Sequence, residues 1–391
     1  MKKEILFGLA IGLFALTGCQ DELYKDVTEE FKSPQGIYVA NKGPVQIFVE
    51  EGQEVTVKDL NVALSQKSNK EMQASIEAGN QSQLDAYNKK NNTEYILLPK
   101  EMYEIPSVLT FKAGIAKQAI TMKLKDLKFP IAGDYALPIR LKGGTTSVIE
   151  GEDEALLVVE KRIQTKSLRI NGSGSENASM FPSDFKVDQW TMEVMVNRAS
   201  YSINNRAICG TKLVQNAGPQ DEIYTRFGDV TISPNQLQIK TGSSQIDVDK
   251  SKFAANPNTW YMITFVYDGH KNKVYINGEL VAEREIRTGP YGMVGFWLSG
   301  ANELIREVRF WKTARTAQQI KAYTWKMVNP DEEDLLLYYP LNGMKRDANS
   351  KEITKDESQL WDWSKNAKHL PKPSNSVFDD NGGNSFVFPI K

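Results

Sequence analysis

The side chains that most often carry covalent, redox or metal chemistry are scarce in this sequence. The chain holds two cysteines, Cys19 and Cys209, and two histidines, His270 and His369. They do not form a cluster with zinc-ligand spacing, and a histidine general base has only these two candidates. Neither a Gly-x-Ser-x-Gly elbow nor a phosphate-binding Gly-Lys loop is present. Cys209 stands beside Gly210 in a strand-like stretch, which indicates a small buried side chain.

Pairs of carboxylates could hydrolyse a glycosidic bond. A retaining glycosidase holds its two carboxyl groups about 5–5.5 Å apart. Glu303 and Glu307 share a strand face by parity, but apolar positions separate them and they resemble ordinary sheet carboxylates. We therefore predict that the protein is not an enzyme. A glycoside hydrolase whose carboxylates come from distant strands is the alternative.

Carboxylates could also bind calcium, which prefers oxygen ligands. The candidates are Asp221, Glu222, Asp229, Asp379 and Asp380. None of them has EF-hand spacing. The sequence therefore predicts no cofactor, and a structural calcium ion stays open.

Aromatic side chains offer the best candidates for ligand binding. Phe296 and Trp297 are adjacent on one predicted strand, so their side chains must point to opposite faces of the sheet. We predict that Trp297 points outward. The candidate ligand-binding residues around it and elsewhere are Trp297, Tyr291, Asn302, Trp361, Tyr224 and Arg226. Trp190, Trp260 and Trp311 lie in strand motifs where a buried ring is expected, and Trp363 lies in a turn.

The elements that position these residues are almost all strands. Short alternating apolar runs separated by Gly, Pro or Lys-Asp turns extend from residue 37 to 141, interrupted by a helix at 81–90. In the second half, Asn277-Gly278 predicts a hairpin turn, and Thr316 with Gln319 predicts a helix-capping box. The pattern predicts an all-β fold with two sandwiches, at residues 36–162 and 163–391.

The N-terminus predicts export. Lys2 and Lys3 precede the apolar run 5–16, which is shorter than the roughly 20 residues of a spanning helix. The sequence Leu16-Thr17-Gly18-Cys19 resembles the lipobox of bacterial lipoproteins, whose cysteine becomes the acylated N-terminus. This resemblance implies a signal peptide at 1–18, lipidation at Cys19 and a tether at 19–35. An ordinary cleaved signal peptide is the alternative.

The residues after Cys19 suggest a destination. Gln20-Asp21-Glu22 resembles the export tag that places lipoproteins of some Gram-negative gut bacteria on the outer face of the outer membrane. We therefore expect a protein anchored in the outer membrane by lipid alone and facing the cell exterior. Once Cys19 is acylated, Cys209 has no partner for an intramolecular disulfide. Charge is balanced, with 48 basic and 49 acidic residues, so nucleic acid is not an expected partner.

The first predicted sandwich resembles a known family. Its ordered motifs are Leu84-Asp85-Ala86-Tyr87-Asn88, residues 93–99, Ala113-Gly114 and residues 135–139. They resemble an N-terminal domain of unknown function in surface lipoproteins of polysaccharide-utilisation loci. The resemblance implies an immunoglobulin-like spacer in which Leu84 and Tyr87 pack the helix and Pro99 and Pro138 set chain turns.

The second predicted sandwich resembles the laminin-G-like branch of the concanavalin A-like jelly rolls. The motifs are residues 260–269, 273–278, 305–311, 337–343 and 362–366. Proteins of this class bind sugar on a concave sheet face or its rim, where aromatic rings cover the C–H face of the sugar and planar polar groups take its hydroxyls. The Glu-x-Asp-x-x-Glu strand of the glucanases is missing.

The two resemblances together lead to a functional expectation. We expect a surface lipoprotein that binds glycan non-catalytically and assists polysaccharide capture and uptake, with outer-membrane transporters or enzymes as partners. The alternative from a different class is an adhesion or scaffold protein that binds other proteins.

Overall fold

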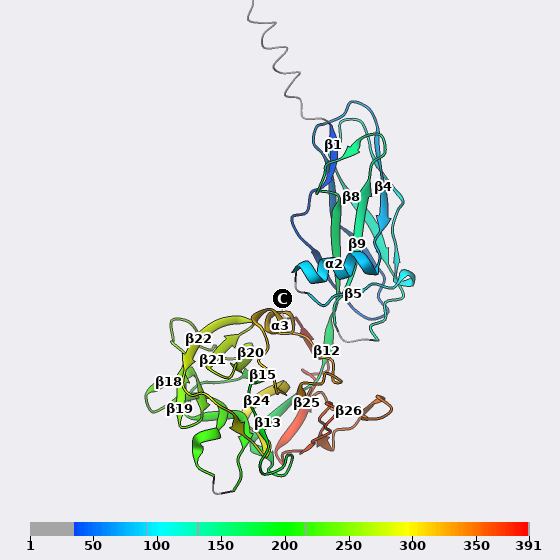
Figure 1. Cartoon of the computed structure of the whole chain (residues 1–391). Coiled ribbons are helices and arrows are strands. Elements are labelled where there is room, and N and C mark those ends of the chain that lie inside the picture. Colours follow the sequence, from blue (N-terminus) through cyan, green and yellow to red (C-terminus); the bar gives the residue numbers. More distant parts are fainter. Residues whose placement is uncertain (1–34, 92, 131–132, 216, 390–391) are drawn as a thin grey trace, which may run out of the picture.

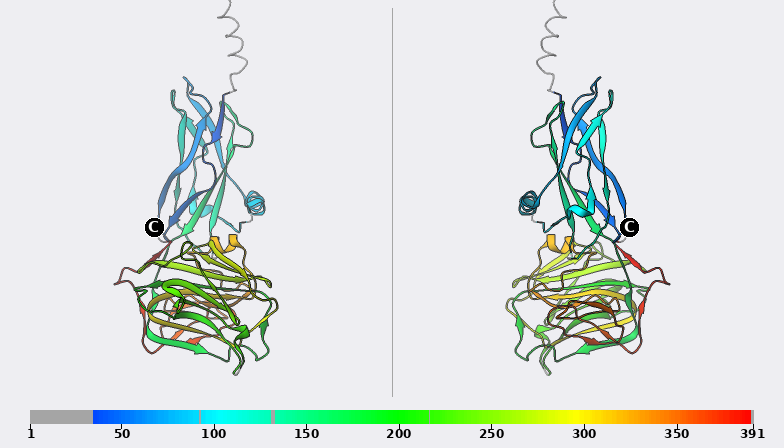
Figure 2. Two further views of the ribbon diagram at one scale, coloured as in Figure 1. Left: turned by 90° about the vertical axis from the view of Figure 1, so that its left-hand side faces the viewer. Right: turned by 90° about the vertical axis from the view of Figure 1, so that its right-hand side faces the viewer.

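The structure, a computed structural model, describes residues 35–91, 93–130, 133–215 and 217–389, so the predicted signal peptide, Cys19 and nearly all of the tether lie outside the described residues. Two β domains are stacked end to end, and helix α3 lies at their junction (Figure 1). The side views show the same arrangement (Figure 2). In the described part of the chain, no helix combines the length and apolar character needed to cross a membrane.

The first domain is a β-sandwich of the predicted immunoglobulin-like kind. One sheet has the order β10-β1-β3-β8-β6, and the other has the order β2-β11-β9-β4-β7 with β5 beside β9. A single core of mostly aliphatic side chains fills the space between them. The elements are β1 (Gly36–Val39), β2 (Val45–Val49), β3 (Val55–Leu64), β4 (Met72–Ala78), α2 (Gln81–Asn91), β5 (Ile96–Leu97), η1 (Lys100–Met102), β6 (Tyr103–Glu104), β7 (Val108–Phe111), β8 (Lys117–Leu124), β9 (Tyr135–Lys142), β10 (Ser147–Val148) and β11 (Glu154–Lys161).

Helix α2 packs outside this core as predicted. Leu84 is fully buried, and Tyr87 packs beside it and stacks on Tyr95 at 6.2 Å between ring centroids. The prediction that Pro138 sets a turn is wrong, because Pro138 lies inside β9 opposite Leu156. The pairing of β9 with β4 stops at Ile139, the residue after Pro138, so the missing N–H of proline leaves no gap in that ladder.

The second domain is a jelly roll in which twelve strands form one hydrogen-bonded network and eight short strands form four separate pairs. Its elements are β12 (Ile163–Thr165), β13 (Ser167–Asn177), β14 (Lys186–Val187), β15 (Trp190–Arg198), β16 (Arg206–Lys212), η2 (Pro219–Asp221), β17 (Ile223–Asp229), β18 (Ile232–Thr241), β19 (Ser244–Asp247), β20 (Trp260–Tyr267), β21 (Lys271–Ile276), β22 (Glu279–Glu285), β23 (Tyr291–Gly292), β24 (Gly295–Trp311), α3 (Ala317–Ala322), β25 (Leu335–Tyr339), β26 (Met344–Arg346), β27 (Ile353–Lys355), β28 (Gln359–Leu360), β29 (Leu370–Pro371), β30 (Ser376–Asp379) and β31 (Phe386–Phe388).

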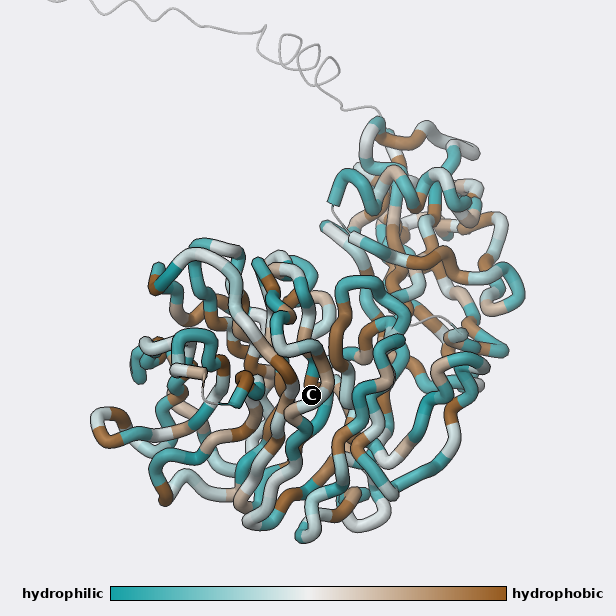
Figure 3. Tube along the Cα trace, turned by 60° about the horizontal axis from the view of Figure 1, so that its bottom comes forward, coloured by the Kyte–Doolittle hydropathy of each residue, from teal (hydrophilic) through white to brown (hydrophobic). Residues whose placement is uncertain are grey.

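The long strand β24 joins the two layers of the jelly roll. Its first residues pair with β16, and its last residues pair with β15 and β25. The first layer therefore contains β16 to β19 with the start of β24, and the second contains β15, β20, β21, β22 and β25 with its end. The main core lies between the layers and includes Trp190, Phe227 and Phe310. Hydrophobic and hydrophilic residues alternate along many strands of both domains (Figure 3).

Two local signals in the sequence are confirmed. Asn277 and Gly278 both have positive φ, at 50° and 85°, as the two-residue turn between β21 and β22 requires. Thr316 caps α3 in a capping box with Gln319. The predicted boundary near residue 162 falls between β11 and β12, and β12 pairs with β31 from the other end of the chain.

Candidate functional site

The outer face of the first layer, here called the open face, carries a row of side chains across six strands. The register places Glu176, Trp297, Gly210, Tyr224, Lys240 and Gln245 in successive neighbouring strands. Phe296 and Leu298, on either side of Trp297 in sequence, point into the core. Trp297 and Tyr224 are half-buried, and among the described residues neither belongs to a hydrophobic cluster. The prediction that Phe296 points inward and Trp297 outward is confirmed.

Gly210 makes room for the two aromatic rings. A Cβ atom at this position would collide with the Tyr224 Cβ and would lie 2.8 Å from Cζ2 of Trp297. The indole Nε1 of Trp297 donates to the backbone oxygen of Thr211 at 3.2 Å. The ring centroids of Trp297 and Tyr224 are 6.0 Å apart. Together they form an apolar platform that is fixed before any ligand arrives.

Beside this platform lies a polar network centred on Arg226. Its guanidinium donates to Gln238 Oε1 at 2.5 Å, to Asn205 Oδ1 at 2.7 Å and to Asp229 Oδ2 at 2.5 Å. Gln238 donates in turn to Asp247 Oδ1 at 2.7 Å. The guanidinium carbon lies 5.7 Å from the Tyr224 ring centroid, so the network adjoins the platform.

Electrostatics keep the groups of this face in defined protonation states. The pKa of the Asp229 carboxyl is lowered, chiefly because the backbone of Val230 hydrogen-bonds it, with Gln238 and Arg226 adding to the effect. Burial raises the pKa of the Tyr224 hydroxyl. Asp229 is therefore an anionic acceptor and Tyr224 a neutral donor at neutral pH. The two rings of the platform are tilted by 53° to each other, and an aromatic ring beside fixed donors and acceptors can hold a sugar ring.

Three of the six predicted ligand-binding residues, Trp297, Tyr224 and Arg226, are thus brought together. The sequence interpretation missed their polar neighbours Gln238 and Asp247 and the row members Glu176 and Lys240. The sequence pattern that could have identified them is the alternation within β13, β18 and β19, because it places these polar residues on the face of the sheet that points away from the core.

The prediction of Tyr291 as a ligand-binding residue is wrong. Its side chain is fully buried, its ring packs against Trp190 at 5.6 Å between centroids, and its hydroxyl lies 2.7 Å from Oγ1 of Thr241. Strand β23 ends at Gly292 and β24 begins only at Gly295, so the alternation that orients Trp297 does not extend back to Tyr291.

Asn302 and Trp361 lie outside the open-face group. Asn302 is exposed at an irregularity of β24, with φ of 86°, and its Oδ1 accepts from Arg169 at 3.0 Å. Trp361 is half-buried in the C-terminal segment. Its ring packs on His369 at 4.7 Å between ring centroids, and its Nε1 donates to the backbone oxygen of Asp356 at 3.0 Å. The structure connects neither of them with the Trp297 platform by a hydrogen bond or ring contact among the described residues.

The prediction that Glu303 and Glu307 share a sheet face is wrong. Glu303 forms a buried ion pair with Arg198 at 2.7 Å, and Arg198 lies over the core ring of Phe227. Glu307 has a positive φ of 48° at an irregularity of the strand and points to the other side. There it binds Arg309 at 2.8 Å and accepts from the Tyr338 hydroxyl. The extra residue breaks the parity on which the prediction depended.

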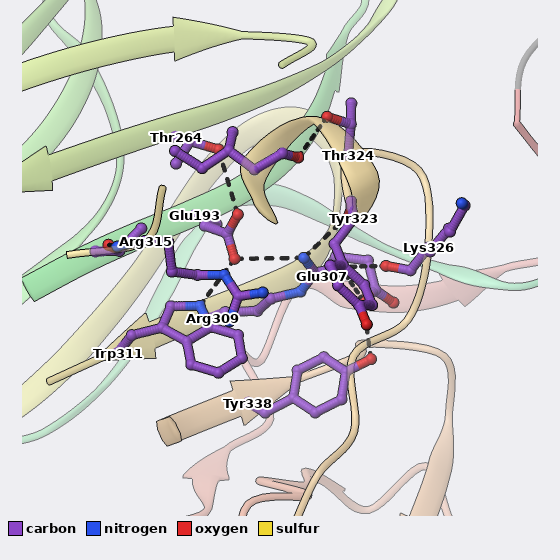
Figure 4. A network of polar contacts seen from close by, with 12 residues as sticks. Glu193, Thr264, Glu307, Arg309, Trp311, Arg315, Tyr323, Thr324, Lys326 and Tyr338 are labelled. Carbon is purple, nitrogen blue, oxygen red and sulfur yellow. Dashed lines mark hydrogen bonds and ion pairs between the residues drawn. The ribbon is translucent and has the colours of Figure 1, made fainter. Parts of the chain in front are cut away.

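The outer face of the second layer, here called the covered face, carries this buried ionic network (Figure 4). Arg309 bridges Glu307 and Glu193, and Glu193 also accepts from Trp311 Nε1 at 2.9 Å. All four side chains are buried. Ile320 of α3 and Phe388 of β31 cover neighbouring parts of the face. Trp190 and Trp311 are fully buried as predicted, whereas Trp260 is half-buried against Phe386 and Phe388.

The remaining candidate residues have structural surroundings. Asp221, Asp229 and Asp379 each pair with an arginine, namely Arg287, Arg226 and Arg169. Within the described ranges, no group of three or more His, Cys, Asp or Glu side chains is arranged to hold a metal ion. Cys209 is fully buried, and burial raises the pKa of its thiol. Trp363 is buried and donates to the backbone of Met344 at 3.0 Å.

Comparison with protein families identifies both halves of the chain. Residues 171–321 match the concanavalin A-like lectin/glucanase superfamily. Residues 31–148 match a family described as an N-terminal domain. No match was found among curated proteins.

Among the similar solved structures, one alignment spans both domains and others cover only part of the chain. A Bacteroides ovatus protein provisionally assigned as carbohydrate-binding aligns over 88% of this chain and 97% of its own, with 22% identity and a TM-score of 0.54. A heptameric SAP-like pentraxin from Limulus polyphemus aligns over 40% of this chain and 81% of its own, with 14% identity and a TM-score of 0.32. EndoBT-3987 of Bacteroides thetaiotamicron, solved with a Man5GlcNAc product, aligns over 32% and 30%, with 19% identity and a TM-score of 0.27. Only the first similarity is close enough to support the fold.

Proposed function

We propose that this protein binds glycan non-catalytically through the open face of its jelly roll. The observation that carries the proposal is the pairing of Trp297 and Tyr224 over Gly210, beside the fixed network of Arg226. The rings would cover the C–H face of a sugar, and the network with Lys240 would take its hydroxyls. The concanavalin A-like fold and the Bacteroides ovatus structure support this class of ligand.

The absence of catalysis is part of the proposal. The two carboxylates that the sequence offered as a catalytic pair are each engaged by an arginine, Glu303 by Arg198 and Glu307 by Arg309. Asp229, the acid of the network beside the platform, is held by Arg226 and Gln238. A general acid in a glycosidase needs a raised pKa, and the pKa of Asp229 is lowered instead.

The cellular setting is also a proposal. We infer that Cys19 is acylated and anchors the protein in the outer membrane, with the body facing the cell exterior. The first domain then serves as a spacer, and the jelly roll presents captured polysaccharide to a transporter or enzyme at the same membrane. Metabolic labelling with an alkyne-bearing fatty acid should mark the wild-type protein and leave Cys19→Ala unmarked. Surface protease treatment of intact cells should degrade the protein.

A glycan array tests the binding function. The full chain should bind at least one polysaccharide or oligosaccharide on the array, and Trp297→Ala should lose that signal. Silence of the wild-type protein on a broad array, combined with sugar-independent co-purification of a membrane protein, would replace this proposal with a scaffold role. A slow release of reducing sugar from a bound polysaccharide would instead show a glycosidase.

A further inference from the structure

The junction between the two domains encloses a cleft of about 510 Å³. This volume lies within the roughly 300–1,000 Å³ of typical small-molecule sites. The first domain supplies Phe48 and the loop at 93–95, and the second supplies α3 and the segment 323–326. Figures 1 and 2 show α3 at this junction. The cleft is separate from the open face, because neither Trp297 nor Tyr224 lines it.

Aromatic side chains line both walls of the cleft. Phe48 and Tyr95 come from the first domain, and Tyr323 and Trp325 come from the second. Phe48 is 39% exposed, which leaves apolar surface available to a ligand. Trp325 is held in place by stacking on Phe388 at 6.3 Å between ring centroids. The cleft thus has rings on opposite sides.

The charged groups of the cleft are mostly carboxylates. Lys326 joins Asp134 at 2.5 Å and Glu160 at 3.1 Å, and this ion pair ties the two domains together. Glu94 adds a third carboxylate and Lys321 a second ammonium group, and the described residues that line the cleft include no arginine. Carboxylates therefore outnumber cations, which disfavours an acidic ligand. Amide groups of Gln46, Gln318 and Gln319 complete a lining that suits hydroxyl groups.

The cleft wall that comes from the second domain is held in place by the buried ionic network. Arg309, fixed by Glu193 and Glu307, donates to the backbone oxygens of Tyr323 and Lys326 (Figure 4). At the other end of the cleft, Gln318 Nε2 donates to the backbone oxygen of Asn91 at 2.8 Å. The buried ionic network of the covered face therefore fixes the part of the chain that lines the cleft.

We propose that this interdomain cleft is a second binding site, which takes a short neutral oligosaccharide. The inference rests on the proposed function for the class of ligand, and on the cleft itself for its position and charge preference. Because both domains contribute a wall, the first domain is part of a binding site as well as a spacer.

Ala322→Trp and Phe48→Ala test the cleft from its two walls. Ala322 is an exposed residue at the end of α3, so a tryptophan there fills the cleft without removing a side-chain contact. Ala348→Trp, at an exposed position in the turn after β26, is the matched control for the first variant, and Val108→Ala, 47% exposed on β7, for the second. Calorimetric titration of each full-chain variant uses gluco-, manno-, xylo- and galacto-configured tetrasaccharides and tetragalacturonate as probes.

At least one neutral tetrasaccharide should bind the wild-type protein and both controls, and its affinity for the cleft should fall at least tenfold in Ala322→Trp and Phe48→Ala. Tetragalacturonate should not bind the cleft. If every bound probe is lost in Trp297→Ala and unaffected by the two cleft variants, the cleft inference is overturned and the open face stands. If binding is lost only in the cleft variants, the cleft inference stands and the open face fails. Absence of binding by all probes overturns the cleft as a site for neutral tetrasaccharides.

Discussion

Both outer faces of the jelly roll carry aromatic side chains, but one face is open to solvent and the other is covered. On the open face, Trp297 and Tyr224 stay half-buried, with polar neighbours that reach solvent. On the covered face, Trp311 and Tyr338 are fully buried beneath the chain that follows β24. Helix α3, strand β31 and the segment between α3 and β25 cover the second face and shield it from solvent. The covered face can therefore support the neighbouring cleft, whereas we expect a large polymer to bind directly only at the open face.

The charged side chains of the two faces differ in solvent exposure in the same way as the aromatic side chains. Arg226 is 12% exposed and Asp229 is 20% exposed, so their pair is accessible at its edge. Arg309 and Glu307 are both 0% exposed. A buried charge that loses its partner is far more costly than an exposed one, because it cannot be solvated by water. Substitutions on the covered face should therefore change stability, and those on the open face should change binding.

The largest effect should come from Arg309→Ala. The substitution leaves Glu193 and Glu307 buried without their common cation, which costs about 3–5 kcal/mol of unfolding free energy. Urea denaturation measures it. Lys212→Ala breaks the exposed pair with Glu176 and should cost about 1 kcal/mol or less. Equal losses in the two variants would show that burial does not distinguish the faces.

A pH effect of about 3 kcal/mol should come from Asp362, in the turn beside β25. Burial raises the pKa of its carboxyl from 3.8 to about 6, against four hydrogen bonds that lower it. The folded state therefore binds the proton more tightly than the unfolded state, so this contribution is present below pH 4 and is lost as pH rises through 6. Unfolding free energies of the wild type and Asp362→Asn at pH 4 and 7 measure it. The wild type should lose more stability over this interval, and parallel pH profiles would contradict the assignment.

Gly210→Ala should damage both stability and binding on the open face. The new methyl group would collide with Tyr224 and press on the Trp297 ring, at a cost of about 1–3 kcal/mol. Gly174→Ala is the control, because its Cβ would meet the Leu298 backbone oxygen at 2.9 Å on the same layer without touching the aromatic pair. Both variants should be less stable, but only Gly210→Ala should weaken glycan binding. An unchanged affinity would show that the geometry of the pair is not needed.

A smaller effect is expected of Tyr291→Phe. Loss of the buried hydroxyl contact with Thr241 should cost about 1 kcal/mol. Glycan affinity should stay within twofold, because Tyr291 lies in the core. Thermal denaturation and the array signal together check this, and a lost signal with an intact fold would restore Tyr291 as a binding residue.

Sequence reasoning was most successful where periodicity alone decides orientation. Adjacent residues on one strand must face opposite ways, so Trp297 was placed outward once Phe296 was placed inward. The Asn277-Gly278 turn and the Thr316 capping box depend on local chemistry and were equally accessible. The two resemblances gave the sandwich class of each domain, which the two-layer sheets confirm.

The failures have different physical causes: parity does not survive the irregularity at Glu307, whereas the positions of Tyr291 and Pro138 depend on packing and strand pairing that the local sequence does not show. Glu307 sits at an irregularity with positive φ, and Tyr291 is separated from β24 by a break in the strand. The buried role of Arg309 had a weak signal, since three charged residues lie among apolar ones in the predicted strand 305–311. The sequence holds no signal for the interdomain cleft, because the cleft walls come from segments more than 150 residues apart that meet only through domain packing.

The most direct test of the open face compares two half-buried tryptophans. Affinities of the full chain, Trp297→Ala and Trp361→Ala for the strongest glycan on the array can be measured by calorimetric titration. Removing a ring that packs on sugar should cost about 1.5–3 kcal/mol, or roughly tenfold to a hundredfold in Kd. We expect this loss in Trp297→Ala and less than a twofold change in Trp361→Ala. The opposite ranking, or equal affinities in all three proteins, would contradict glycan binding at the open face.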